Sequence, residues 1–524
     1  MTFFLFFSLL PLLLLITHHL HARHLHRRFA LQHGCLPARR VPQPGLLEST
    51  IGYRLFRSDV RAARKRQTLS TAQRRFRTHG HTFAGVCLGQ YFITTIDGDN
   101  VKALLSTRMD DFDSGKIALF GPFIGQSMLT SDGAVWRHAR GLVRPHLVRE
   151  RVVGELLAGG LEGHFGALMR RVLEDGKILG GGVVEVDLKP LFGMLMFDNT
   201  MEMLLGVKIS SLEDRDSGSR LAKFVHAFES VGGFVNKRAK LGPLLRFYQD
   251  TKFERQCKVL HDFVDGVVRE AYEKKQREEK KGGEDGSSSS SRNRGFLASI
   301  LEDTSDLVKI RFEVLGVLLA GRDTAADLMG SLFFVLARRP DVWGKLKEEV
   351  DRVLAGANPR HDSLKELTYH RYVIEEALRL YPPAPVLFRA ANKTTLLPRG
   401  GGPDGRSPVL VPRGTVVSCS TFALQRRRDI YGDDADEFRP ERWEAMERLR
   451  TRPHWEFLPF SAGPRVCMGQ NYAMAETVYV LARMAQEFDA IEPNGGPAEW
   501  VEDWNITVGS GAGAKVRLTR RKEE

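Results

Sequence analysis

Apolar residues recur every three or four positions over long stretches of this chain, and these stretches dominate from about residue 130 to the C-terminus. Such spacing places apolar side chains on one face of a helix, so the pattern predicts a series of amphipathic helices. Two shorter pieces, near residues 83–95 and 407–420, are rich in β-branched and aromatic residues and are typical of strands. The pattern therefore predicts a mainly helical protein with small β-sheets, an α+β fold.

One predicted helix, residues 310–336, is apolar around almost its whole circumference. A surface helix would carry a polar face, so this helix is expected to be buried. Its middle holds a polar sequence with a glycine, AGRDT at residues 320–324. Two interpretations are open: a kink whose polar groups are satisfied locally, or a functional groove over a bound cofactor.

Residues 273–294 interrupt the helical pattern, because they are almost all charged, polar or glycine. Such a composition buries too little apolar surface to fold, and it predicts a solvated loop or flexible insert between two helices. No other low-complexity stretch divides the chain, so residues 46–524 are predicted to form one domain.

The N-terminus carries a continuous apolar run, FFLFFSLLPLLLLI at residues 3–16, which with its neighbours reaches the lower limit of a membrane span. Basic residues follow the run, at Arg23, Arg27 and Arg28, and no small-x-small cleavage site is present. An uncleaved membrane anchor over residues 1–20 is therefore favoured over a signal peptide. The positive charges behind the run predict that the rest of the chain is cytoplasmic.

A basic, proline-rich spacer is predicted between this anchor and the body, at residues 21–45, with residues 36–45 extended. Five histidines lie between residues 18 and 26, where the predicted anchor meets the spacer. A metal site is one interpretation of them, but the sequence shows no hydrogen-bond partners that would fix such ligands. A polar flank at the membrane interface is favoured. The histidines are His18, His19, His21, His24 and His26.

The chain has 77 basic and 64 acidic side chains, a formal net charge of +13. This charge raises the question of nucleic acid or an anionic membrane surface as a partner. Seven basic residues lie within residues 61–77 on a predicted helix. No zinc finger or aromatic–basic platform accompanies them, so membrane lipid is favoured and nucleic acid is discounted. A content of 42% hydrophobic and 27% charged residues excludes general disorder.

The five cysteines are odd in number and far apart, which argues against a disulfide framework and for a reducing compartment. One of them, Cys467, lies between Gly463 and Gly469, directly before a helical pattern. A helix N-terminus and the nearby Arg465 favour a thiolate, and glycines let a large flat group approach the backbone. Taken alone, a cysteine near glycines is more often a small buried hydrophobic residue.

The stretch FSAGPRVCMG, from Phe460 to Gly469, resembles the haem-binding loop of the cytochrome P450 superfamily. Further stretches resemble that family in its order: WRHAR at 136–140, AGRDT at 320–324, EALR at 376–379 and FRPERW at 438–443. The similarity extends from about Gly34 to the end of the chain. It implies the cytochrome P450 fold, a triangular helical prism that encloses haem b.

The resemblance also implies a role for each matched residue. Cys467 would be the axial ligand of the haem iron, Thr324 would hydrogen-bond dioxygen, and Asp323 would relay protons. Five residues would hold the rest of the haem: Arg465, Trp136, Arg140, Arg389 and Phe460. An ion network of structural importance would consist of Glu376, Arg379 and Arg442.

The implied activity is hydroxylation of a C–H bond with O2. The chain shows no flavin or dinucleotide domain, so electrons are expected from NADPH through a separate NADPH–cytochrome P450 reductase. Four basic residues could guide an acidic redox partner, or could form a plain solvated face: Arg137, Arg144, Arg149 and Arg151. The anchor and spacer resemble microsomal members, which implies the endoplasmic reticulum membrane.

Residues 121–147, 397–417 and 429–443 are similar to the fungal n-alkane and fatty-acid ω-hydroxylases. Those enzymes tend to carry asparagine where Leu387 stands, and a second threonine where Ala325 stands. A tailoring monooxygenase of secondary metabolism is therefore the alternative within this fold, and residues 120–124 are expected to help decide. A haem- or lipid-binding protein without turnover is a rival from another class.

Overall fold

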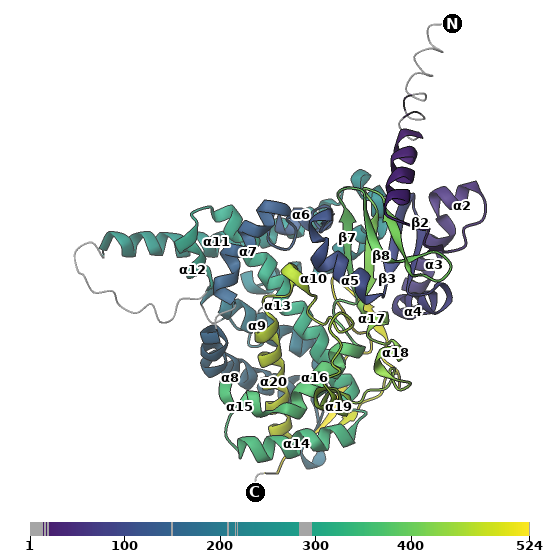
Figure 1. Cartoon of the computed structure of the whole chain (residues 1–524). Helices are drawn as coiled ribbons and strands as arrows, with labels where there is room; N and C mark the ends of the chain where they lie inside the picture. Colours follow the sequence, from purple (N-terminus) through teal and green to yellow (C-terminus); the bar gives the residue numbers. More distant parts are fainter. Residues whose placement is uncertain are drawn as a thin grey trace.

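The computed structural model describes residues 20–147, 150–206, 209–214, 218–281 and 296–522, together with Leu14, Thr17 and Asp216. Helices build most of the body, and strands gather mainly at one side of it (Figure 1). The predicted mainly helical fold with small β-sheets is therefore confirmed. The principal helices are α2 (Leu46–Ile51), α3 (Tyr53–Arg64), α4 (Thr68–His79), α6 (Ile117–Ile124), α7 (Gly133–Leu147), α8 (Glu150–Asp175), α9 (Leu188–Leu205), α10 (Arg220–Leu241), α11 (Thr251–Lys281), α12 (Phe296–Asp303), α13 (Leu307–Leu336), α14 (Pro340–Leu354), α16 (Thr368–Leu380), α19 (Glu441–Leu449) and α20 (Gln470–Glu487).

Six strands form the main sheet, and both predicted strand regions belong to it in part. The hairpin of β2 and β3 turns through Leu88 and Gly89, both at positive φ (48° and 77°), which is the geometry that suits the twist of a two-residue hairpin. β3 pairs in parallel with β10, which pairs antiparallel with β7. The order is β1 (Arg39–Arg40), β2 (Thr82–Cys87), β3 (Gln90–Thr95), β10 (Val416–Ser420), β7 (Val386–Ala391) and β4 (Phe112–Asp113).

Three smaller sheets complete the β structure. One has four strands, in the order β11 (Phe488–Pro493), β14 (Lys515–Arg520), β6 (Val183–Asp187) and β5 (Lys177–Leu179). Two hairpins consist of β8 (Thr395–Gly401) with β9 (Ser407–Val411), and β12 (Glu502–Trp504) with β13 (Val508–Ser510).

Helix α13 confirms the expectation of a long buried helix. Asp306 caps its N-terminus by accepting a hydrogen bond from the Lys309 backbone N–H at 3.0 Å. The helix is continuous through residues 320–324 and packs along α9, so it passes through the middle of the body (Figure 1). Ala320 is an exposed residue in the middle of this otherwise buried helix.

Two predictions about the surface helices are wrong in detail. The helical pattern was expected to end at Glu273, but α11 continues to Lys281, and an ion pair one turn apart joins Arg277 to Glu273 at 3.2 Å. Charged residues on an exposed helix can sustain it through such pairs without any apolar face. The rest of the predicted insert lies outside the described residues. The basic stretch 61–77 belongs to two helices, α3 and α4, because the chain turns at Arg66 with φ of 53°.

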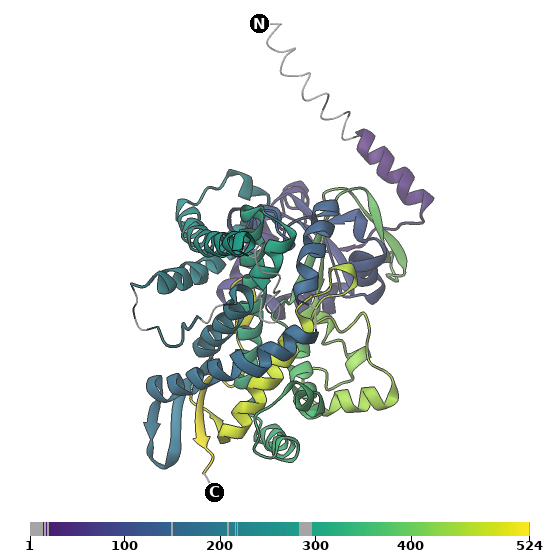
Figure 2. The ribbon, with the colours of Figure 1, turned by 90° about the vertical axis from the view of Figure 1, so that its left-hand side faces the viewer.

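Most of the predicted anchor, residues 1–20, lies outside the described residues, as do His18 and His19. A helix covers residues 20–32 and projects away from the body in both views (Figures 1 and 2). Among the described residues, no helix has the length and apolar character needed to cross a membrane. The described part of the chain also holds no cluster of three or more His, Cys, Asp or Glu suited to a metal ion.

The predicted extended spacer lies against the sheet. Its backbone donates from Leu36 to Pro408 at 2.9 Å and from Val41 to Ala84 at 3.0 Å, and the carbonyl of Pro37 accepts from Gly402. These ladder-like bonds attach the segment directly behind the projecting helix to the body.

Candidate functional site

The loop before α20 holds Cys467 at a fixed bend. The Cys467 backbone N–H donates to the Phe460 carbonyl at 3.0 Å, and Val466 donates to Gly463. Gly463 has φ of 68°, and a Cβ there would lie 2.1 Å from the Leu105 carbonyl oxygen, so only glycine fits. The loop therefore takes one shape, and it leaves Cys467 exposed two residues before Gly469, the residue that precedes α20.

Burial among protein atoms raises the pKa of the Cys467 thiol. A hydrogen bond from the Gly469 backbone and the positive charge of Arg140 act in the opposite direction and lower it. The Cys467 side chain is accessible from outside the chain, although protein atoms surround much of it. A bound metal ion would deprotonate such a thiol outright. Cys467 is thus suited to be a metal ligand and not a free nucleophile.

Helix α13 approaches the same region. Met468 and Tyr472, next to Cys467 in the sequence, pack against the apolar cluster that contains Leu318 and Leu319 of α13. Ala320 follows directly, and its exposure in this buried helix marks the surface that a cofactor would cover.

Polar residues in the middle of α13 contact one another and α10. Thr324 Oγ1 donates to the Ala320 carbonyl at 2.6 Å, as expected of a threonine that bonds back one turn. Asp323 Oδ1 accepts from Arg322 at 3.0 Å, and Arg322 also pairs with Glu229 of α10 at 2.8 Å. Burial raises the pKa of Asp323, and the adjacent Arg322 opposes that rise. The links to Arg322 and Glu229 were not anticipated from the sequence.

Three cations converge near the Cys467 loop: Lys116, Arg389 of β7 and Arg465. Burial, then the charges of Arg389 and Arg465, lower the pKa of Lys116 to about 8. Burial and Arg465 lower the pKa of Arg389 to about 10. Asp132 accepts from Arg465 at 2.6 Å, and Asp132 and Asp113 are the carboxylates that offset part of this charge.

Positive charge in this cluster thus exceeds negative charge. Arg389 donates to the Phe388 carbonyl at 2.8 Å, while its Nε is buried without a hydrogen-bond partner in the described part of the chain. Buried cations require anions, and the two propionates of a haem would supply them. The cluster therefore fits the group that the Cys467 loop is expected to bind.

Helix α7 joins this cluster to the Cys467 loop. Arg140 donates to the Val466 carbonyl at 2.9 Å, and the Arg140 and Arg465 guanidinium groups lie 5.9 and 4.3 Å from the Trp136 ring centroid. The predicted residues Trp136, Arg140 and Arg465 are therefore brought together. Sequence reasoning missed Lys116, because no local pattern distinguishes a single lysine that only the fold places beside two arginines.

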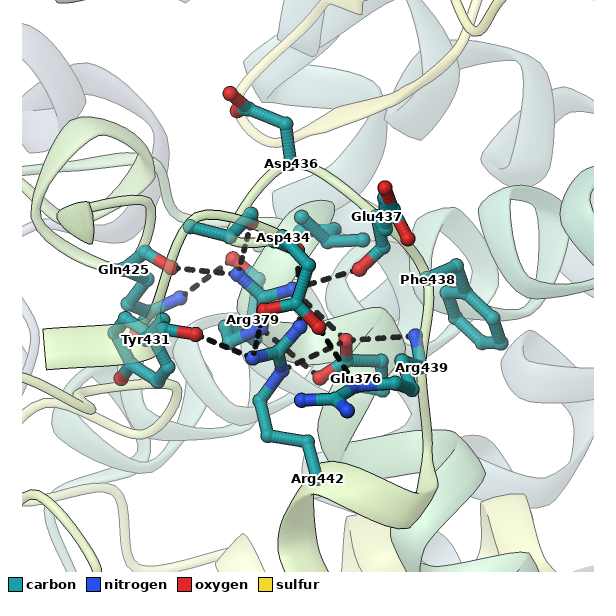
Figure 3. A network of polar contacts seen from close by, with 12 residues as sticks. Glu376, Arg379, Gln425, Tyr431, Asp434, Asp436, Glu437, Phe438, Arg439 and Arg442 are labelled. Atoms are coloured by element: carbon teal, nitrogen blue, oxygen red, sulfur yellow. Dashed lines mark hydrogen bonds and ion pairs between the residues drawn. The ribbon is translucent and has the colours of Figure 1, made fainter.

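The predicted Glu–Arg–Arg network is fully buried (Figure 3). Arg379 donates to both carboxylate oxygens of Glu376, at 2.9 and 2.8 Å, and to the backbone carbonyls of Gln425, Ala435 and Glu437. These five bonds use all five N–H groups of the guanidinium. Arg442 reaches Glu376 at 3.4 Å and Asp434 at 2.9 Å, so Asp434 is a further member.

The network binds α16 to the loop before α19 and to α19 itself. Glu376 also accepts from the Arg439 backbone N–H at 2.9 Å and from Trp443 Nε1 at 3.1 Å. A buried charge pair with every partner present is stable, whereas one broken partner is costly. The network thus joins α16 to residues 434–443 through buried hydrogen bonds.

A buried acid on α20 gives a pH-dependent prediction. Glu476 is 1% exposed, its carboxyl accepts a hydrogen bond from the Asn199 side chain, and burial raises its pKa to about 8. The folded-state pKa exceeds the ordinary value of 4.5, so the contribution of Glu476 to stability is fully present below pH 4.5 and is lost as pH rises towards 8. Glutamine does not titrate, so Glu476→Gln should gain stability over the wild type across this range, by up to about 5 kcal/mol.

Chemical unfolding of both haem-bound proteins at several pH values between 4.5 and 9 checks this prediction. The difference between their unfolding free energies should grow with pH and level off above about pH 8. A difference that does not vary with pH would contradict the raised pKa.

A mainly helical body that presents one cysteine at the start of a helix, beside a cluster of uncompensated cations, defines a haem-thiolate protein. Residues 54–510 match the family described as Cytochrome P450. The chain is 37% identical over 502 residues to Cytochrome P450 monooxygenase fsdH of Fusarium heterosporum, covering 94% of this chain and 85% of that protein. It is 37% identical over 494 residues to Cytochrome P450 monooxygenase himC of Aspergillus japonicus, covering 94% and 85%. It is 34% identical over 489 residues to Cytochrome P450 52A13 of Debaryomyces hansenii, covering 89% and 88%.

The chain therefore belongs to the cytochrome P450 family, and it is a haem monooxygenase. Members of this family use O2, a substrate and electrons from a redox partner. The family assignment made from the sequence motifs is confirmed, together with haem as the cofactor.

Proposed function

We propose that this monooxygenase hydroxylates the terminal carbon of fatty acids or n-alkanes. The observation that carries the proposal is the resemblance of residues 121–147, 397–417 and 429–443 to the fungal ω-hydroxylases. The similarity to Cytochrome P450 52A13 over 89% of the chain and the apolar residues near Ala320 are compatible with it. The overall reaction consumes R–H, O2, NADPH and a proton, and yields R–OH, water and NADP⁺.

Each residue of the site would have its own role in binding the haem. Cys467 would ligate the haem iron, and Arg465, Arg140, Arg389 and Lys116 would hold the propionates, with Trp136 and Phe460 packed beside them. When bound, the haem supplies the redox chemistry of oxygen activation, to which a thiolate ligand donates electron density.

Asp323 and Thr324 would control protons. The Thr324 hydroxyl donates to the Ala320 carbonyl, which leaves its oxygen lone pairs free to accept a hydrogen bond from a proton donor. Asp323, whose pKa burial raises and which Arg322 orients through a hydrogen bond of 3.0 Å, would take up a proton from solvent and pass it to the interior. If protons are delivered in step with electron transfer, the reduced oxygen would end in hydroxylated product and not in hydrogen peroxide.

Thr324→Ala is expected to uncouple the reaction. NADPH oxidation should continue, while the share of electrons recovered in hydroxylated product falls on the order of tenfold or more and hydrogen peroxide rises, since the hydrogen-bond acceptor that orders proton delivery is gone. The measurement is parallel quantitation of NADPH, product and peroxide. Thr324→Ser keeps the hydroxyl and should stay coupled; equal uncoupling in both variants would contradict the role of the hydroxyl.

The cellular setting forms part of the proposal. The apolar run at residues 3–16 would anchor the protein in the endoplasmic reticulum membrane with the catalytic domain in the cytoplasm and basic α3 and α4 near lipid. An NADPH–cytochrome P450 reductase would supply electrons. Arg137 and Arg144 are exposed on α7 and available to an acidic partner, whereas Arg149 lies outside the described residues, as does the side chain of Arg151.

A second candidate function is tailoring of a secondary metabolite. The apolar Leu387 favours it, because the ω-hydroxylases tend to have asparagine there; in the structure Leu387 is part of β7 opposite Cys419 and packs against the main-sheet core. Buried Ala325 is the second departure.

One assay separates these candidates. The purified protein is combined with a fungal reductase, NADPH and a panel of fatty acids and alkanes, and the hydroxyl position is assigned by mass spectrometry. A terminal alcohol supports ω-hydroxylation. Absence of any lipid product from a protein that shows a thiolate-type haem spectrum would overturn the substrate proposal and leave the family assignment intact.

A further inference from the structure

Helix α6 contains a proline in its interior, and this leaves one of its carbonyl groups without an intrahelical partner. Pro122 has no backbone N–H, so it cannot donate to the Ala118 carbonyl one turn earlier. An unpaired carbonyl beside a protein core carries a free-energy cost unless another donor reaches it.

Arg238 of α10 supplies that donor. Its Nη2 donates to the Ala118 carbonyl at 2.8 Å, and its Nε donates to the Leu119 carbonyl at 3.2 Å. The arginine is 9% exposed, and its guanidinium lies 5.1 Å from the Phe253 ring centroid of α11. Within the described residues its hydrogen bonds go to these carbonyls and not to a carboxylate, which is an unusual use of a buried charge.

Two other helices hold the same segment. His261 of α11 lies 2.7 Å from the Phe123 carbonyl, one of the last carbonyls of α6, which helix geometry leaves unpaired. Glu313 of α13 accepts the Met128 backbone N–H at 3.1 Å, just beyond α6. The segment is thus fixed through its backbone, which leaves its side chains free to vary.

The segment borders the proposed substrate side of the site. Phe120 of α6 and Met128 pack against the apolar cluster that contains Leu319, the residue before exposed Ala320. Any shift of α6 therefore moves the apolar wall beside the centre of α13.

We infer that Arg238 is a positioning residue: by completing the hydrogen bonds that Pro122 removes, it holds α6 against α10 and fixes the wall past which ligands reach the haem. The inference concerns access to the haem and does not depend on which substrate is oxidised.

The decisive experiment is a double-mutant cycle on the full-length haem-bound protein. Arg238→Met leaves the Ala118 carbonyl unpaired and removes a second hydrogen bond, to the Leu119 carbonyl, so amide hydrogen exchange across residues 117–125 should accelerate on the order of tenfold. Stopped-flow binding of an imidazole inhibitor to the ferric haem should become faster by a similar factor, while the reduced-CO spectrum stays unchanged. Lys240→Met is the matched control, since Lys240 is exposed on the same helix.

Pro122→Ala tests whether the effect of Arg238→Met depends on the hydrogen bond that Pro122 cannot make. Alanine restores an N–H that can donate to the Ala118 carbonyl, so Pro122→Ala combined with Arg238→Met should recover most of the wild-type exchange rate and inhibitor-binding rate. Arg238→Lys keeps one donor group and should give intermediate values.

If Arg238→Met does not fold, the double variant Arg238→Met with Pro122→Ala is expected to fold, and its folding would support the inference in the same way. Unchanged exchange in Arg238→Met, or an acceleration that Pro122→Ala does not reduce, would overturn the inference.

Discussion

Replacing Cys467 by serine is expected to abolish hydroxylation and the thiolate signature of the haem. The sulfur is the one donor that the loop presents at the start of α20, and serine has neither its softness nor its acidity as an iron ligand. The reduced-CO difference spectrum should lose the red-shifted band of thiolate ligation, and turnover should fall by at least about a thousandfold.

The matched control is Cys35→Ser. Cys35 is a free, partly exposed cysteine behind the projecting helix, far in sequence from the Cys467 loop, and its replacement should leave the spectrum unchanged. A thiolate-type spectrum in the Cys467→Ser protein would show that another residue ligates the iron.

The second large effect is expected at the buried ion network. Arg379→Met removes five hydrogen bonds at once and leaves the Glu376 carboxylate, which is fully buried, with only its partners from the α19 region. Breaking a buried pair on one side costs about 3–5 kcal/mol, a large part of the stability of a domain. The protein should unfold at lower denaturant concentration and be purified with less haem, because the segment leading to the Cys467 loop is no longer held.

Arg371→Met gives the comparison within the same helix. Arg371 is partly exposed and pairs with Glu447 at 2.9 Å near the surface, so its loss should cost no more than about 1 kcal/mol. Equal losses of stability and haem content in the two variants would contradict a special role for the buried network.

The sequence was most informative where a requirement is local. The all-round apolar pattern predicted α13, and the spacing around Cys467 predicted the loop, because a glycine at positive φ and a cysteine before a helix are set by a few neighbouring residues. The sequence was less informative where the hydrogen-bond partners of a side chain are backbone groups far away along the chain. The backbone carbonyls of Gln425, Ala435 and Glu437 complete the hydrogen bonds of Arg379, and a backbone carbonyl has no sequence signature.

The same reasoning explains the missed side chains. Lys116, Glu229 and Asp434 stand in ordinary polar surroundings along the chain and acquire meaning only through residues of other elements. The extension of α11 to Lys281 was missed because composition alone does not distinguish a charged solvated helix from a charged loop.

The order of strands in the main sheet has a consequence for how the protein is made in the cell. β3 pairs with β10, so Phe92 finds its neighbour only when Val416 has been synthesised, and β4 must likewise wait for β7. The loop that carries Cys467 leaves the ribosome later still. The first half of the chain therefore cannot complete its core during translation, and contacts between such distant segments form slowly. We therefore expect the main sheet and the Cys467 loop to assemble late, after most of the polypeptide has been synthesised, and the cofactor to be captured at that stage.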